Sequence, residues 1–137
     1  MSEAAKAVPV LTGEKTIDAE HDVQVQLLNS LAKSLQTVDG LSAAHYVLDQ
    51  FIEFSDMHFL SEQLVMRLHS YPGYEPHLEQ HTRLMKKVRE IRSSVQRGEA
   101  HLSLTLTQEL RDWLLTHIAT EDVTFGEFLK SKEGRAS

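Results

Sequence analysis

Apolar residues recur at steps of three and four along four long segments, and this spacing most constrains what the chain can fold into. The spacing is typical of helices that bury one face, whereas no stretch sustains the alternation of a half-buried strand. The segments run from about 18–38, 42–69, 75–97 and 103–129. The three prolines lie outside the segment interiors, and Asp39-Gly40 and Gly98 mark breaks between segments. The sequence therefore predicts an all-α chain.

Short connections between such helices make sequential neighbours antiparallel, so we expect an up-down-up-down antiparallel four-helix bundle. Residues 1–137 are expected to form one domain, with 1–16 as an N-terminal arm and 131–137 as a tail. Ser42 is expected to cap the second helix, and Pro76 to occupy the first turn of the third. The apolar stripes of the first two helices are expected to include Val23, Leu27, Leu28, Leu31, Leu35, Val38, Val47, Leu48, Phe51, Ile52, Phe54, Leu64, Val65 and Leu68.

Composition excludes several classes of protein. The chain has no cysteine, which removes disulfides, thiolate zinc sites and iron–sulfur clusters. Its net charge of −6 argues against a dedicated nucleic-acid binder. No apolar run approaches the roughly 20 residues that span a bilayer, and the start lacks the apolar core of a signal peptide. We expect a soluble, cytoplasmic protein with no nucleic-acid or membrane partner.

Histidine is abundant, with eight residues in 137, and several lie at same-face helical spacing. The second helix carries His58 four residues before Glu62, and the third carries His77 four residues before His81. Every helix then contributes a residue of metal-ligand type, namely His21, His58, Glu62, His77, His81, His117 and either Glu121 or Asp122. The other histidines, His45, His69 and His101, are interpreted as ordinary residues.

Counting supports a dinuclear site. Imidazole and carboxylate ligands suit iron, zinc or manganese. Two octahedral metals offer twelve coordination positions. Five histidines, two bridging carboxylates and one bridging oxygen fill eleven of them and leave one open, which is what reversible capture of a small diatomic molecule requires. Ferritin-like oxidation sites differ, because they are richer in carboxylates.

The same residues resemble hemerythrins, and especially bacteriohemerythrins, which are non-haem di-iron oxygen-binding bundles. The matching stretches are Ile17-Asp18-Ala19-Glu20-His21, His58-Phe59-x-x-Glu62, Tyr71-Pro72-Gly73-Tyr74-Glu75-Pro76-His77-x-x-x-His81 and Trp113-Leu114-x-x-His117-Ile118-x-x-x-Asp122-x-x-Phe125. The resemblance covers about 12–129. The N-terminal arm departs from it, because Thr12-Gly13-Glu14 stands where the family has a tryptophan and Val-Gly-Ile.

The resemblance implies two iron ions with an oxo or hydroxo bridge. One iron would be held by His77, His81 and His117. The other would be held by His21 and His58 and would keep the open position for dioxygen. Glu62 and Asp122 would bridge both irons. The oxygen pocket would be walled by Leu114, which matches the family's shielding leucine, and by Phe59, Trp113 and Ile118.

The spacing from His117 to Asp122 conflicts with a regular helix. Five residues turn a regular α-helix by about 500°, roughly 140° away from one face. Glu121, at spacing four, is the better ligand by geometry alone, whereas the resemblance favours Asp122. Choosing Asp122 predicts a local widening or π-type bulge near 117–122.

The function expected from this reading is reversible dioxygen binding, for storage, delivery or sensing, and not catalysis. One alternative is a di-iron enzyme, either a peroxidase, an oxidase or a nitric-oxide reductase. Another is an oxygen- or redox-sensing signalling domain with an unidentified redox or signalling partner. The ligand types alone also leave zinc and manganese open.

Overall fold

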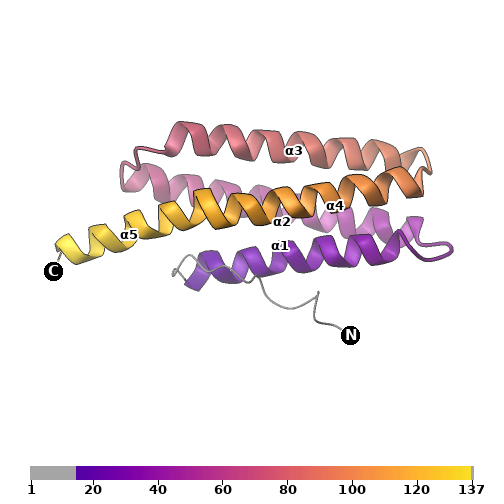
Figure 1. Cartoon of the computed structure of the whole chain (residues 1–137), viewed down its shortest axis with the longest axis horizontal. Coiled ribbons are helices and arrows are strands. Elements are labelled where there is room, and N and C mark those ends of the chain that lie inside the picture. Colours follow the sequence, from indigo (N-terminus) through magenta and orange to yellow (C-terminus); the bar gives the residue numbers. More distant parts are fainter. Residues whose placement is uncertain (1–14, 137) are drawn as a thin grey trace.

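Four long helices lie antiparallel and side by side in this computed structural model, which describes residues 15–136 (Figure 1). Each helix contacts two neighbours, in the pairs α1–α2, α2–α3, α3–α4 and α4–α1. The fourth helix is continuous but has three parts, because a π-helical turn joins α4 to α5. The bounds are α1 Lys15–Ser34, α2 Leu41–Leu68, α3 Tyr74–Gln96, α4 Ala100–His117, the π-helix η2 Ile118–Asp122 and α5 Val123–Ala136. The predicted all-α up-down-up-down bundle is confirmed.

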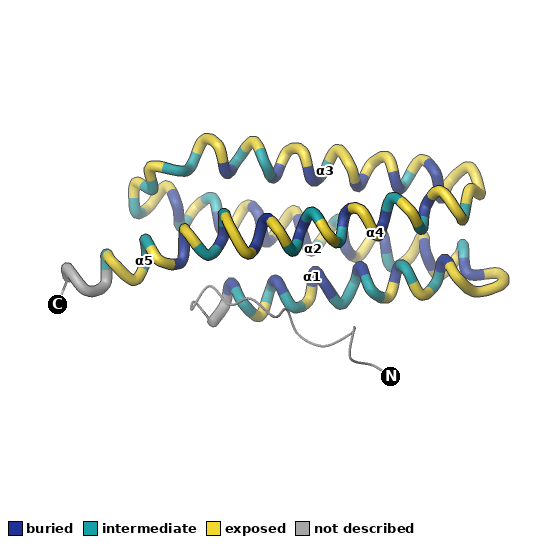
Figure 2. The backbone as a smooth tube through the Cα atoms, viewed as in Figure 1, coloured by how far each residue is buried: buried dark blue, intermediate teal, exposed yellow. Residues whose placement is uncertain are grey.

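The helix faces that point into the bundle are buried along its whole length (Figure 2). The larger apolar cluster fills the part of the bundle next to the α1–α2 and α3–α4 turns, and includes Leu28, Leu31, Phe51, Leu84, Ile91 and Leu110. A smaller cluster at the opposite end consists of Ile17, Met66 and Phe125, with Tyr71 and Phe128 packed against it. Between the two clusters lies a layer of buried polar side chains.

That polar layer explains why part of the predicted stripes is wrong. In α1 the buried face passes through His21, Gln24, Leu28 and Leu31, so Val23 lies outside it and is 39% exposed. In α2 the buried face passes through Ser55, His58, Glu62 and Met66. Leu64 and Leu68 therefore point to solvent, 54% and 79% exposed. A buried face predicted from apolar residues alone is therefore shifted around the helix wherever polar residues occupy core positions.

The turn between α1 and α2 starts earlier than predicted. α1 ends at Ser34, and Val38 lies in the turn, 91% exposed. The Thr37 hydroxyl donates to the Ser34 carbonyl at 2.9 Å, which gives this carbonyl a side-chain partner in place of the next helical turn. Ser42 lies inside α2, whose cap is Gly40 without a side-chain hydrogen bond. A Cβ at Gly40 would lie 1.8 Å from the Ser34 oxygen, so only glycine fits here.

Both ends of the last helix extend beyond the prediction. α4 begins at Ala100 after Glu99, and Ser103 lies inside the helix, where its hydroxyl donates to the Glu99 carbonyl at 2.8 Å. α5 continues to Ala136, past the predicted end near Leu129, through a segment in which lysine, glutamate, arginine and alanine favour the helix despite Gly134. Figure 1 shows α5 running on beyond the bundle. Of the predicted N-terminal arm, Lys15 and Thr16 belong to α1, and Thr12-Gly13-Glu14 lies outside the described residues.

No helix in the described part of the chain is both long enough and apolar enough to cross a membrane.

Gly40 gives a test of this turn. Gly40→Ala should lower the free energy of unfolding by about 2 kcal/mol, because the new Cβ overlaps a backbone oxygen that must move. The control is Gly98→Ala, where φ is +74° and nothing lies within 4 Å of the added Cβ. It should cost about 1 kcal/mol of left-handed strain. Urea unfolding of both variants measures the difference, and a Gly40→Ala protein as stable as Gly98→Ala would contradict the packing described.

Candidate metal centre

The structure brings all seven residues chosen from the sequence into one buried layer. Their side chains are only 1–3% exposed. All four helices contribute, because the antiparallel order places the start of α1 and α3 beside the end of α2 and the α4–α5 junction (Figure 1). The contributions are His21 from α1, His58 and Glu62 from α2, His77 and His81 from α3, His117 from α4 and Asp122 from η2.

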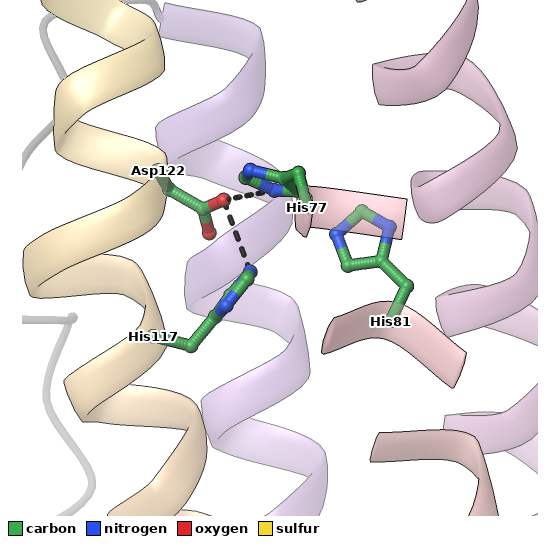
Figure 3. Close-up of side chains that lie close together, drawn as sticks. All are labelled: His77, His81, His117 and Asp122. Carbon is green, nitrogen blue, oxygen red and sulfur yellow. Dashed lines mark ion pairs between the residues drawn. The ribbon is translucent and has the colours of Figure 1, made fainter. Parts of the chain in front are cut away.

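Three histidines gather on one side of the layer. Figure 3 shows His77, His81 and His117 with their rings facing a common space beside Asp122. The Oδ1 atom of Asp122 lies 2.9 Å from Nε2 of His77 and 3.2 Å from Nε2 of His117. One ligand atom from each of these four residues lies within 4.8 Å of those of the others. This is the spacing expected of groups that can surround one metal ion.

The other two histidines lie on the opposite side of the layer. The rings of His21 and His58 meet edge to face, with centroids 5.1 Å apart. Together with Glu62 they form a second group whose potential ligand atoms all lie within 4.8 Å of one another. The layer therefore holds a three-histidine set and a two-histidine set.

Each carboxylate faces both sets. In Glu62, Oε1 lies 3.0 Å from the Nε2 atoms of His77 and His81, while Oε2 lies 3.9 Å from Nε2 of His58. In Asp122, Oδ1 faces His77 and His117, while Oδ2 lies 2.9 Å from Nε2 of His21. Two carboxylates that each present one oxygen to either side are arranged as bridges between two cations.

The π-helix places Asp122 in this layer. The predicted widening is confirmed, because residues 118–122 form a π-helical turn between α4 and α5. A π-turn holds more residues than an α-turn, so a spacing of five returns to the same face. Asp122 is accordingly 2% exposed and contacts three histidines, whereas Glu121 is half-buried and is not part of either group.

Several polar atoms in the layer lack a hydrogen bond despite these short distances. Among them are Nε2 of His21, His81 and His117, together with Oδ1 of Asp122 and Oε2 of Glu62. Buried polar groups in folded proteins are normally satisfied, since leaving them unpaired costs stability. These atoms point at shared spaces and not along donor–acceptor lines. The donor set and its unpaired atoms fit bound metal cations.

The carboxylates are held ionised. Burial and the negative charge of Asp122 raise the pKa of Glu62, but the close contacts with His77 and His81 outweigh them and bring that pKa to about 2. The pKa of Asp122 is also lowered, because contacts with His117, His21 and His77 overcome the cost of burial. Burial lowers the pKa of His77, yet its close contacts with both carboxylates raise it to about 9. The layer thus presents two anionic groups, as a cation site requires.

The outer nitrogens of three histidines are hydrogen-bonded to side chains that our sequence reasoning missed. Nδ1 of His58 lies 2.5 Å from Glu20, and Nδ1 of His117 lies 2.6 Å from Gln80. Nδ1 of His81 lies 3.2 Å from Nε2 of Gln63. Such partners fix the orientation of metal-binding imidazoles. Each partner is on a different helix from its histidine, so no spacing along one helix could reveal it; the available signal was a polar residue flanking a candidate ligand.

The four predicted pocket residues surround the layer. Phe59 stacks on His81 with centroids 3.9 Å apart, and Trp113 stacks on His117 at 5.2 Å. Leu114 and Ile118 are buried in the larger apolar cluster. An open cavity of about 270 Å³ lies between α2 and α3, with Phe59 and His81 among its lining residues. The two aromatic rings therefore contact the three-histidine set most closely.

Comparison with known proteins places this layer in a family. The family described as Hemerythrin HHE cation binding domain matches residues 12–129. A bacteriohemerythrin of Methylococcus capsulatus is 28% identical over 114 residues, covering 83% of this chain and 86% of the relative. One from Ralstonia nicotianae is 30% identical over 110 residues, covering 80% and 77%. A solved structure, described as that of a leucine-to-phenylalanine mutant, has a TM-score of 0.76 at 27% identity, covering 85% of this chain and 88% of that one.

Metal content tests the choice of Asp122 over its neighbour. Asp122→Asn should reduce the metal bound per chain, because a negative charge and one carboxylate oxygen that faces the histidines are lost. Glu121→Gln is the matched control, and it should bind as much metal as the unmodified protein. Elemental analysis after reconstitution and desalting measures both. Loss of metal from Glu121→Gln with retention in Asp122→Asn would reverse the assignment.

Proposed function

This chain belongs to the hemerythrin family, and from that premise we propose that it binds dioxygen reversibly at a non-haem di-iron centre. Storage, delivery and sensing of oxygen are all compatible with such binding. Family membership favours a binding protein over an enzyme. The proposal specifies two iron ions as the metal and dioxygen as the ligand, and the geometry of the polar layer supports both.

The observation that carries the proposal is the placement of the two carboxylates. Glu62 and Asp122 each direct one oxygen toward the three-histidine set and the other toward the two-histidine set. A site for a single ion would not need two carboxylates that each direct their two oxygens to opposite sides of the layer. In the proposed assignment, His77, His81 and His117 would hold one iron, His21 and His58 would hold the second, and Glu62 and Asp122 would each offer one oxygen to either iron.

The unequal histidine count supports an exchangeable position. Three imidazoles and two bridging oxygens leave the first iron with fewer free positions than the second, which has two imidazoles. Nitrogen and oxygen ligands without thiolate suit iron in its two common oxidation states. When bound, the pair of irons supplies the electrons that reversible oxygen capture needs. The position next to His21 and His58 is where dioxygen would enter.

The surrounding residues keep the centre intact and dry. Glu20 accepts the Nδ1 proton of His58, and Gln80 accepts that of His117, so each ring presents Nε2 to the metal. Leu114 and Ile118 are almost fully buried and close the layer on the side of the larger apolar cluster. Excluding water on that side would limit proton transfer to a ligand held at the centre.

The function is tested by loading the metal-free protein with ferrous iron under nitrogen and then admitting air. We expect a coloured form that appears with oxygen, persists, and disappears when oxygen is removed. Absorption spectra over several cycles record the reversibility. A spectrum that decays rapidly while a supplied reductant is consumed would instead support the enzymatic alternative.

The side chain of Leu114 is expected to slow the autoxidation of the oxygen-bound protein. Leu114→Ala opens space next to the centre, so autoxidation should be roughly tenfold faster, a barrier lower by about 1.4 kcal/mol. The control is Leu110→Ala, one helical turn further from the metal layer and equally buried. Both variants lose about 2–5 kcal/mol of stability, so only a local effect separates them. Equal autoxidation rates in the two variants would remove Leu114 from the mechanism.

A further inference from the structure

A buried polar pair, Gln24 and Ser55, joins α1 to α2 outside the set of seven residues. Nε2 of Gln24 donates to Oγ of Ser55 at 3.0 Å, and both side chains are fully buried. Oε1 of Gln24 has no hydrogen-bond partner. A glutamine that buries its amide with one atom unpaired is costly unless something else satisfies that atom.

The pair lies one helical turn from the two-histidine set. Gln24 follows His21 by three residues on α1, and Ser55 precedes His58 by three residues on the antiparallel α2. Side chains on a helix lean toward its N-terminus, so Gln24 leans over the turn that carries His21, and His58 leans toward the level of Ser55. The pair therefore spans the same α1–α2 interface as the His21–His58 contact and lies directly beside it.

The rest of this level is apolar. On α3 the residue three positions after His81 is Leu84, and on α4 the residue three positions before His117 is Leu114. Both leucines are almost completely buried. This otherwise apolar level therefore contains the amide of Gln24 and the hydroxyl of Ser55, which lie on α1 and α2, the helices that hold the two-histidine set.

Another buried polar pair shows that polar pairs in this core can be satisfied. The hydroxyls of Ser94 and Ser103 lie 2.6 Å apart at the opposite end of the bundle. Ser94 also bonds to the Ile91 carbonyl, and Ser103 to the Glu99 carbonyl. In the described part of the chain, the unpaired buried side-chain atoms outside the seven-residue layer are Oδ1 of Asp22 and Oε1 of Gln24. Only Gln24 of these two is fully buried.

We propose that Gln24, positioned by Ser55, is a specificity-determining residue that hydrogen-bonds a small ligand on the metal held by His21 and His58. This inference rests on the proposed function, because it requires a metal at the two-histidine set. The unpaired atom of the amide is its carbonyl oxygen, which only accepts hydrogen bonds, while the amide nitrogen already donates to Ser55. The pocket therefore favours small ligands that carry an N–H or O–H hydrogen over bare anions and apolar molecules of the same size.

Binding of cyanamide, which carries N–H hydrogens, and of azide, which carries none, to the oxidised, iron-loaded protein tests this. Gln24→Met keeps the length of the side chain but removes its hydrogen bonds, so the cyanamide dissociation constant should rise roughly tenfold, as for loss of one hydrogen bond, while that of azide should change less. Titration followed by absorption measures both constants. Ser94→Ala, in the distant pair, is the matched control, and its cyanamide affinity should equal that of the unmodified protein.

The double variant Gln24→Met/Ser55→Ala separates ligand recognition from a structural role. Removing both partners eliminates the unpaired groups, so the metal-free double variant should unfold at the same or a higher temperature than Gln24→Met. Its cyanamide affinity should stay roughly tenfold below that of the unmodified protein. Recovery of cyanamide affinity together with stability, or unchanged cyanamide affinity in Gln24→Met, would overturn the inference while leaving reversible oxygen binding intact. Failure of the unmodified protein to retain iron would overturn the proposed function, and the inference with it.

Discussion

The bundle depends on the contacts between two buried carboxylates and five imidazoles. Seven ionisable side chains in one layer are expensive to remove from water, and the attraction between opposite charges offsets that cost only when the geometry is good. Glu62 and Asp122 stay anionic because histidines from all four helices approach them. The same contacts fix the rotation of every helix about its axis, since each must direct its ligand residue inward. The apolar clusters on either side exclude water and so strengthen these interactions.

The π-turn shows how far the backbone adapts to this layer. A regular helix from His117 onward would point Glu121, not Asp122, nearer to the face of His117. The chain instead widens over 118–122, which is a rarer and weaker geometry than α-helix. Asp122 then reaches His21 on α1 as well as His77 on α3. The extra residue of the π-turn lets the Asp122 side chain contact both α1 and α3, whereas a regular helix would direct this side chain away from them.

The sequence predicted the helices and the ligand layer, and it failed where polar residues hold core positions and where contacts cross between helices. The spacing of His58 with Glu62 and of His77 with His81 placed two pairs of candidate ligands on single helix faces directly, because both pairs obey α-helical geometry. The spacing of His117 and Asp122 does not, and only the family resemblance led to it. Val23 and Leu64 were assigned to the core because apolarity was the criterion, while polar residues held the inward positions. Glu20, Gln63 and Gln80 escaped because their contacts cross between helices, which a linear pattern does not record.

The two apolar clusters are of very different size, and this asymmetry bears on how metal enters and leaves. On one side of the polar layer the four helices are joined through a long continuous core, while on the other the buried apolar residues in the described part of the chain are Ile17, Met66 and Phe125. Opening the short side exposes far less apolar surface than unfolding the chain, so it belongs to the low-energy end of the native-state fluctuations. The long side acts as a preformed scaffold during such an opening. Metal exchange can therefore proceed by local opening of the end with the small cluster, while the helices stay packed against one another at the end with the large cluster.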